Sequence, residues 1–465
     1  MNMRRKFTLI LALPVMLALI SAGKGDYIRW EERRQDNNLR TIQEGIPVYD
    51  GETILYSRDG KKYLRVELGE PVEVATSEPG ANISWGFFQF PDLVRDAHTG
   101  HLLIKWQNAQ DNEKYFGKYS GIPSGRLVST DCGKTWTPSG EQIHGDAYCA
   151  VTLADGDVIS CYGGPTLDCA GLELPEIVEK RGAETYYRHS ELPDTLQGIY
   201  VARWDCQTGR TERIHAKVED PGALKFSITH GYEYFPTKWW GDLRLLDDGS
   251  VAAVMYYTSY ETPEGKADRA LSCSCYRSWD RGESWKMVGK IPYVYDEAAD
   301  PNGPKRTLYG YSEPAFEILP DGSWLCVLRT TDNALSPCYW SKSADEGKTW
   351  SDPVPFIPNG VMPRLLTLDN GVTVLLSGRP GVQLRFSADG HGETWTDPFD
   401  FVPYTESVAK AGNFNVSCGY TRVVPAEDKD SFYVVYSTFN HEEDCKTLKS
   451  KSIWFRKVKV TKLSR

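Results

Sequence analysis

The sequence lacks the features that mark several large classes of protein. It has no long basic run, and its formal net charge is -10, so nucleic acid and anionic membrane surfaces are poor candidates as partners. It has no C-x-x-C pair and no H-x-x-x-H pair, which leaves a structural zinc site without support. Its longest apolar run, residues 7–20, is shorter than the roughly 20 residues of a membrane-spanning helix. We therefore expect no metal, no nucleic acid and no membrane insertion.

The first 23 residues are typical of a signal peptide. A basic stretch (MNMRRK) precedes the apolar run, and Ser21, Ala22 and Gly23 supply the small residues of a cleavage site. No Cys follows that could carry a lipid anchor. We expect an exported, soluble protein in the periplasm or outside the cell. Export permits disulfides, but 11 cysteines leave at least one thiol unpaired, and we expect most of them to be small buried hydrophobic residues.

The composition favours a large β protein. With 40% hydrophobic and 25% charged residues the chain is an ordinary globular one, and its 41 Gly, 27 Pro, 14 Trp and 26 Tyr suit a turn-dense, aromatic-rich sheet structure. A single all-β domain can take most of the 465 residues.

A short turn motif repeats along the chain. The pattern S-x-D-x-G-x-[ST]-W begins at Ser129, Ser278 and Ser343, recurs from Ser387 with one extra residue, and has a degenerate copy at residues 205–211. In such a box the Asp accepts backbone N–H bonds, the Gly supplies a positive φ and the Trp packs beneath. The motif staples a hairpin, so we expect these Asp residues to be structural and not catalytic.

A second repeat predicts the architecture. Six times, an apolar strand, a Gly/Asp turn and another apolar strand follow one another, starting near residues 90, 149, 243, 316, 365 and 421. Six hairpins, each extended by an outer hairpin, predict an all-β, six-bladed β-propeller with Asp-box repeats over residues 86–465. Residues 24–85 would supply lead-in strands, one of which could close the ring. Residues 163–198 would form a partly helical excursion that covers one side.

Propeller geometry brings distant residues to one rim. Residues that open the first strand of a hairpin and close the second share that rim, which collects, among others, Gln89, Trp240, Glu313, Arg329, Arg364, Arg379 and Tyr420. Three arginines aimed at one axis repel each other unless an anion or a carboxylate lies between them. The alternative is a channel wall of satisfied polar residues.

Two segments resemble the sialidase (exo-neuraminidase) family over roughly residues 85–460. Ser312-Glu313-Pro314, a strand, Pro320-Asp321-Gly322 and a strand ending in Arg329 are similar to the family segment with the catalytic glutamate and the second arginine of a carboxylate-binding triad. Arg379, eight residues ahead of an Asp box, resembles the third arginine, and Tyr420 the nucleophilic tyrosine. The resemblance implies a six-bladed propeller and an exo-glycosidase that needs no cofactor.

The chain departs from that family at one position. Gln89-Phe90-Pro91 stands where the family has Arg-Ile-Pro with its first arginine. The nearest match to the family's acid is Asp111, in an exposed loop where an Asp is ordinarily solvated or structural.

The resemblance implies a retaining mechanism in which Tyr420 attacks, Glu313 takes its proton, and Asp111 protonates the leaving oxygen. Arg329 and Arg379, with Arg364 nearby, would bind the carboxylate of a terminal sialic or other acidic sugar, and Trp240 would stack on a sugar ring unless it belongs to the blade core. Two alternatives stay open, namely a glycan-binding propeller without turnover and a glycosidase with a non-sialic substrate.

Overall fold

The computed structural model describes residues 48–463 except 57–61, 81–83, 110, 112–123, 162–165, 230–232, 237–238, 301–302, 304–308, 331–335, 380 and 413–415. The predicted signal peptide lies outside this part. The described chain consists of strands and turns, with one short α-helix, α4 (Glu406–Lys410), and two 3₁₀ turns (His189–Glu191 and Asp194–Leu196). The prediction of an all-β protein is confirmed. Within the described residues, no helix is long and apolar enough to cross a membrane.

Six antiparallel sheets follow one another along the chain, and each contains one predicted hairpin; short parallel pairings join the second, third and fourth of them at their sides. The first sheet contains β4 (Phe87–Arg95), β5 (Leu102–Asn108) and β6 (Ser124–Ser129). The second contains β7 (Ala150–Thr152), β8 (Val158–Ser160), β12 (Ile199–Trp204) and β13 (Thr211–Glu219). The third contains β16 (Trp240–Leu245), β17 (Val251–Tyr260), β18 (Ala270–Ser278) and β19 (Ser284–Ile291). The fourth sheet contains β20 (Tyr309–Ile318), β21 (Trp324–Thr330), β22 (Cys338–Ser343) and β23 (Val354–Ile357). The fifth contains β24 (Val361–Thr367), β25 (Thr373–Gly378), β26 (Val382–Ser387) and β27 (Phe399–Val402).

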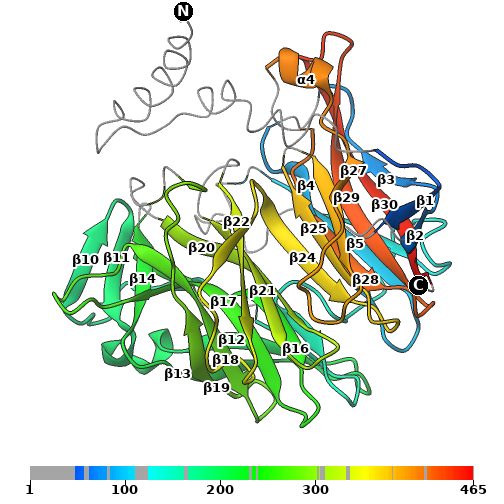
Figure 1. The fold of residues 1–465 in the computed structure, drawn as a ribbon. Coiled ribbons are helices and arrows are strands. Elements are labelled where there is room, and N and C mark those ends of the chain that lie inside the picture. The colour runs from blue at the N-terminus through cyan, green and yellow to red at the C-terminus, as the bar shows by residue number, and fades with distance from the viewer. Residues whose placement is uncertain are drawn as a thin grey trace, which may run out of the picture.

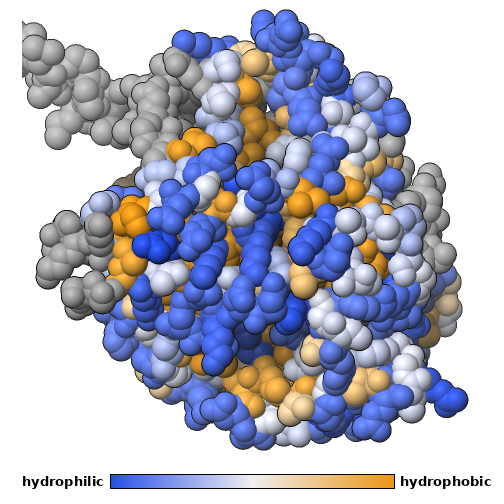
Figure 2. All heavy atoms as spheres, turned by 90° about the vertical axis from the view of Figure 1, so that its right-hand side faces the viewer, coloured by the Kyte–Doolittle hydropathy of each residue, from blue (hydrophilic) through white to orange (hydrophobic). Residues whose placement is uncertain are grey.

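The sixth sheet contains both ends of the described chain. Its hairpin is β28 (Arg422–Pro425) and β29 (Ser431–His441), followed by β30 (Leu448–Lys462). The early strands β1 (Glu52–Tyr56), β2 (Lys62–Leu68) and β3 (Val72–Thr76) complete it, since β2 and β3 both pair with β30 and β1 pairs with β2. Figure 1 shows these strands together on the right, and Figure 2 shows that the face they present is mainly hydrophilic.

Neighbouring sheets pack through their first strands. Strand β7 contacts β16, β16 contacts β20, β20 contacts β24, β24 contacts β28, and β28 contacts β4. The core lies between the sheets. For example, Phe316 and Trp324 of the fourth sheet bury their rings with Val254 and Cys275 of the third. The first strands of the sheets therefore lie side by side, and their starting ends can share a site.

The Asp boxes lie in the turns between outer strands, as predicted. In the box between β18 and β19, Asp280 accepts hydrogen bonds from the Ser278 hydroxyl (2.9 Å) and from the backbone N–H (2.9 Å) and hydroxyl (2.5 Å) of Ser284. The Trp285 indole donates to the carbonyl of Gly282, whose φ is +87°. The side chain thus closes a turn far along the sheet from the starting ends of the first strands.

The excursion after β8 differs from the prediction of a partly helical segment. Strands β9 (Thr166–Asp168), β10 (Ile177–Arg181), β11 (Glu184–Arg188), β14 (Ala223–Thr229) and β15 (Glu233–Pro236) form an additional five-stranded side sheet. Gly182, with φ +58°, closes the β10–β11 hairpin, and the aromatic rings of Tyr186 and Tyr187 are buried. A turn glycine and two aromatic residues favour a hairpin over a helix.

The cysteines behave as small hydrophobic residues. All 11 are unbridged in the described structure, and eight of them are buried. Burial raises the pKa of the Cys161 and Cys273 thiols, which keeps them neutral and unreactive.

Candidate active site

Three first strands open with a β-bulge at their starting ends. Register shifts interrupt β4 around Gln89, β20 between Ser312 and Ala315, and β24 between Val361 and Arg364. The residue before the proline in each bulge has a positive φ: Phe90 (+53°), Glu313 (+44°) and Met362 (+44°). Such a backbone costs on the order of 1–3 kcal/mol per residue and is concentrated at functional sites. A bulge turns side chains away from the regular alternation, and here it aims Glu313 at the neighbouring strands.

Glu313, Arg329 and Tyr420 form one hydrogen-bonded cluster. The Tyr420 hydroxyl donates to Oε1 of Glu313. Oε2 of Glu313 accepts from Nη1 of Arg329 at 2.7 Å and from the backbone N–H of Met362 at 3.0 Å, and the same Nη1 lies 3.2 Å from the Tyr420 oxygen. Glu313 is only 7% exposed. The sequence placed these three residues on one rim, and the structure brings them into direct contact.

The surroundings of the cluster lower the pKa of Glu313 and raise the pKa of Tyr420. Burial opposes ionisation of Glu313, but the Arg329 charge and the hydrogen bonds from Tyr420 and Arg329 hold its pKa below the ordinary value. Burial and the Glu313 charge raise the pKa of Tyr420. The resting state is therefore a phenol that donates to a carboxylate, and that carboxylate is placed to accept the phenolic proton.

Arg379 lies over the ring of Tyr420. Its guanidinium is 5.7 Å from the centre of the Tyr420 ring and 4.9 Å from that of Trp85, and its Nε donates to the carbonyl of Cys418 at 3.0 Å. Burial and the repulsion from Arg329 lower its pKa. Arg329 thus lies at the hydroxyl of Tyr420 and Arg379 over its ring. An added anion would stabilise the buried charge of Arg379.

Asp111 reaches this site through the backbone. Its N–H donates to the Trp85 carbonyl at 3.0 Å, and the indole of Trp85 is the ring over which Arg379 lies. Gly86, with φ +109°, makes the approach possible, because a Cβ there would come within 2.5 Å of the Asp111 nitrogen. The backbone of Asp111 is thus connected to the cluster through Trp85, and its role as the acid stays a prediction.

Gln89 is buried at the start of β4 and is held through its carboxamide oxygen. Its Oε1 accepts from the N–H of Gly86 at 2.6 Å and from Nζ of Lys451 at 2.9 Å, and the side chain is fully buried. The ring of Phe90 contacts Tyr420, with the ring centres 4.7 Å apart. That Gln89 faces the two arginines stays a prediction, since the described contacts of its carboxamide oxygen are with Gly86 and Lys451.

Arg364 also has a different environment from Arg329 and Arg379. Its Nε donates to the Thr421 carbonyl at 3.1 Å, its Nη1 is 3.8 Å from the buried Asp242, and its guanidinium stacks over Tyr148 at 4.5 Å. The side chain is 3% exposed. These contacts are those of a structural residue between first strands, and they do not join it to the arginine pair.

Trp240 starts β16 and pairs its ring with Tyr256, 6.1 Å away. It lines a pocket beside the side sheet and is not part of the Glu313 cluster. No group of three or more His, Cys, Asp or Glu residues suited to a metal occurs in the described part of the chain.

Sequence reasoning missed three contributors to the cluster: Trp85, Phe90 and the N–H of Met362. Trp85 fell in the predicted lead-in segment, one residue before the propeller boundary. The sequence did contain a signal for Phe90 and Met362. Each stands directly before a proline near the start of a first strand, as Glu313 does in β20.

No protein-family model matches the chain, and no curated protein matches it. Among solved structures it is similar to a protein of unknown function from Dyadobacter fermentans DSM 18053, at a TM-score of 0.56 and 20% identity over 85% of this chain and 99% of the other. That likeness shows a shared fold. Weaker likenesses include an α-L-arabinofuranosidase from Fusarium graminearum (TM-score 0.44, 16% identity, 83% of this chain and 97% of that one) and a leech intramolecular trans-sialidase (0.38, 14%, 85% and 70%). Carbohydrate-active enzymes are thus among its distant structural neighbours.

Proposed function

We propose that the protein is an exported, retaining exo-glycosidase that removes terminal acidic sugars from glycans. The observation that carries the proposal is the Tyr420 hydroxyl donating to Glu313, a buried carboxylate that also binds Arg329. Tyr420 is the nucleophile, Glu313 accepts its proton, and Asp111 protonates the leaving oxygen. The glycosyl-tyrosine is then hydrolysed by water, with Asp111 acting as base, so the anomeric configuration is retained.

A tyrosine suits a substrate with a carboxylate at its reacting carbon. An anionic Asp or Glu nucleophile would be repelled by that carboxylate, whereas the neutral phenol is not. The phenol becomes a nucleophile only as Glu313 takes its proton, and Arg329, 3.2 Å from the phenolic oxygen, stabilises the charge that develops there.

The charge of the site supports an acidic sugar. Arg329 is paired with Glu313, and Arg379 adds a second guanidinium beside Tyr420, so that two arginines against one buried carboxylate favour an anionic group on the substrate. We further propose that the six sheets are the blades of a six-bladed propeller, with this cluster at the mouth of its channel. The sequence of contacts from β7 through β28 to β4 supports that arrangement.

A second candidate is a glycosidase whose substrate is not a sialic acid. The specific observation is the burial of Gln89 against Lys451, which leaves Phe90 at the position facing Tyr420. An apolar ring beside Tyr420, in place of a third arginine, favours a sugar that carries less negative charge.

The test is hydrolysis of a panel of aryl glycosides that includes sialosides, uronides and arabinofuranosides. We expect turnover of at least one acidic member, and a mass increase on Tyr420 when the enzyme is incubated with a fluorinated analogue of that sugar. Tyr433→Phe is the matched control, because Tyr433 also donates to a glutamate, Glu427, away from the cluster. Failure of every panel member, or a label on another residue, would refute the proposal.

A further inference from the structure

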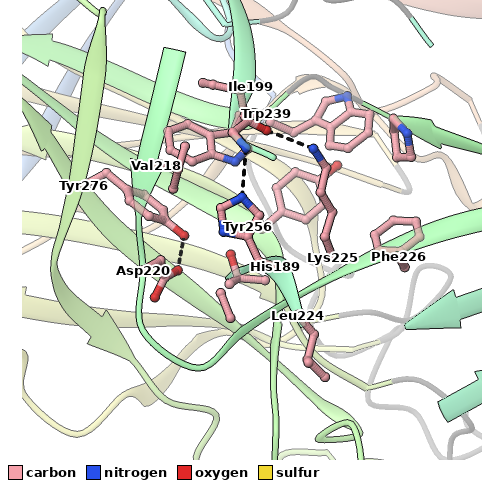
Figure 3. A pocket seen from close by; sticks show the side chains of 15 residues that line it. His189, Ile199, Val218, Asp220, Leu224, Lys225, Phe226, Trp239, Tyr256 and Tyr276 are labelled. Atoms are coloured by element: carbon pink, nitrogen blue, oxygen red, sulfur yellow. Dashed lines mark hydrogen bonds between the residues drawn. The ribbon is translucent and has the colours of Figure 1, made fainter. Parts of the chain in front are cut away.

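A second pocket lies between the third sheet and the side sheet (Figure 3). Its volume is about 80 Å³. Aromatic rings form much of its wall, and three ionisable side chains reach it: Phe226, Trp239, Trp240 and Tyr256, with His189, Asp220 and Lys225. Carbohydrate sites commonly combine aromatic faces with a few polar groups in this way.

Lys225 reaches this pocket and has two backbone carbonyls as partners. Its Nζ donates to the carbonyls of Leu196 at 2.6 Å and Gly198 at 2.9 Å. An ammonium has three donors, and these two carbonyls accept from it. Burial lowers its pKa to about 7. A carboxylate brought in by a ligand would take the third donor and stabilise the charge.

The other two ionisable groups already have partners. Nε2 of His189 accepts from the N–H of Gly198 at 2.8 Å, and burial lowers its pKa to about 4, so the ring is neutral. Asp220 accepts from the hydroxyls of Tyr276 at 2.7 Å and Tyr260 at 3.1 Å. Figure 3 shows Asp220 and Lys225 on opposite sides of the pocket, so the carboxylate does not screen the lysine.

We propose that this pocket takes the carboxylate end of a uronic acid unit of the glycan, with the carboxylate on Lys225 and the sugar ring at the opening against Trp240. The assignment rests on the proposed function in one respect, namely that the bound unit belongs to the same glycan that is cleaved. Tyr256 provides the link, because it lines the pocket and is also an electrostatic neighbour of Arg329. The substrate is then a glycan with an acidic unit next to the sugar that is removed.

The experiment compares binding of methyl β-D-glucuronide and methyl β-D-glucoside by calorimetry and tryptophan fluorescence. We expect the wild-type protein to bind the glucuronide about tenfold more tightly or better, from one charge-assisted hydrogen bond. Lys225→Met should abolish that preference. Lys217→Met, a change at an exposed lysine on β13, should keep it.

Arg379→Ala separates the pocket from the active site, since both are proposed to bind acidic groups. The preference should survive Arg379→Ala. A preference lost in Arg379→Ala but kept in Lys225→Met would overturn the assignment, as would equal binding of the two glycosides by the wild-type protein. If Lys225→Met does not fold, Trp240→Ala replaces it and should weaken both glycosides, and unchanged binding would refute the pocket.

Turnover is measured separately on the aryl glycoside panel. Glucuronide binding that depends on Lys225, without hydrolysis of any panel member, would refute the proposed reaction and leave the pocket assigned. Hydrolysis without any preference for the glucuronide would refute the pocket alone.

Discussion

Replacement of Tyr420 by phenylalanine removes one oxygen and leaves the ring. The lost hydroxyl donates to Glu313 and lies 3.2 Å from Nη1 of Arg329, whereas the edge contact of the ring with Phe90 remains. We expect the free energy of unfolding to fall by about 1–3 kcal/mol, the usual range for a buried polar group left unpaired. Turnover should fall at least about 10³-fold, which corresponds to roughly 4 kcal/mol in the barrier, because the nucleophile is gone.

Glu313→Gln tests the same step from the other partner. It should cut turnover as severely, and should destabilise the fold more, by about 3–5 kcal/mol, because Arg329 is left buried without its carboxylate. The double variant should be little less active than either single variant, since both changes disable one event. The assays are kcat/KM on the best panel substrate and urea unfolding. Near-normal turnover by Tyr420→Phe, or losses that multiply in the double variant, would refute the reasoning.

Asp280→Ala should lower the free energy of unfolding by about 1–2 kcal/mol through its lost turn hydrogen bonds and leave kcat/KM unchanged; an inactive variant with an unchanged melting temperature would contradict a structural role. Gln89→Arg should destabilise the protein, because it buries a second cation beside Lys451, and should gain no sialoside hydrolysis; a stable variant that hydrolyses sialosides faster would contradict the placement of Gln89. Arg379→Ala should raise KM for acidic substrates more than it lowers kcat, measured against a neutral glycoside. The folded pKa of Glu313 is lowered from 4.5, so its stabilising effect is complete above that value and is lost as the pH falls through the lower, folded pKa. The stability difference between wild type and Glu313→Gln should therefore shrink in acid, and a difference that grows there would refute the assigned ionisation.

The hairpins could be predicted because their turns are local. Asp and Gly in each turn, flanked by apolar strands, determine a hairpin without reference to the rest of the chain. The three residues Glu313, Arg329 and Tyr420 could be predicted as well, since strand direction alone places their positions at one end of the sheets. That part of the site follows from topology.

The orientation of Gln89 and Arg364 could not be predicted in the same way. Regular alternation along a strand assigns each side chain to a face, but a bulge with a positive φ shifts that assignment by one residue. Phe90 and Met362 adopt such a backbone, and neither is a residue type that favours it. Contacts with neighbouring sheets hold them there, among them the bond from the Met362 N–H to Glu313, and a single sequence does not display those contacts.

The pairing of β2 and β3 with β30 has a consequence for how the protein is made. Strands β2 and β3 find their partner only in β30, far along the chain, so the sixth sheet stays incomplete until β30 has been synthesised. Contacts across nearly the whole sequence are slow to form, because the loop between them must be closed first. Until then β2 and β29 have open edges on the side that β30 will occupy. Strands of other chains can pair with such edges, so the incomplete protein is vulnerable to aggregation.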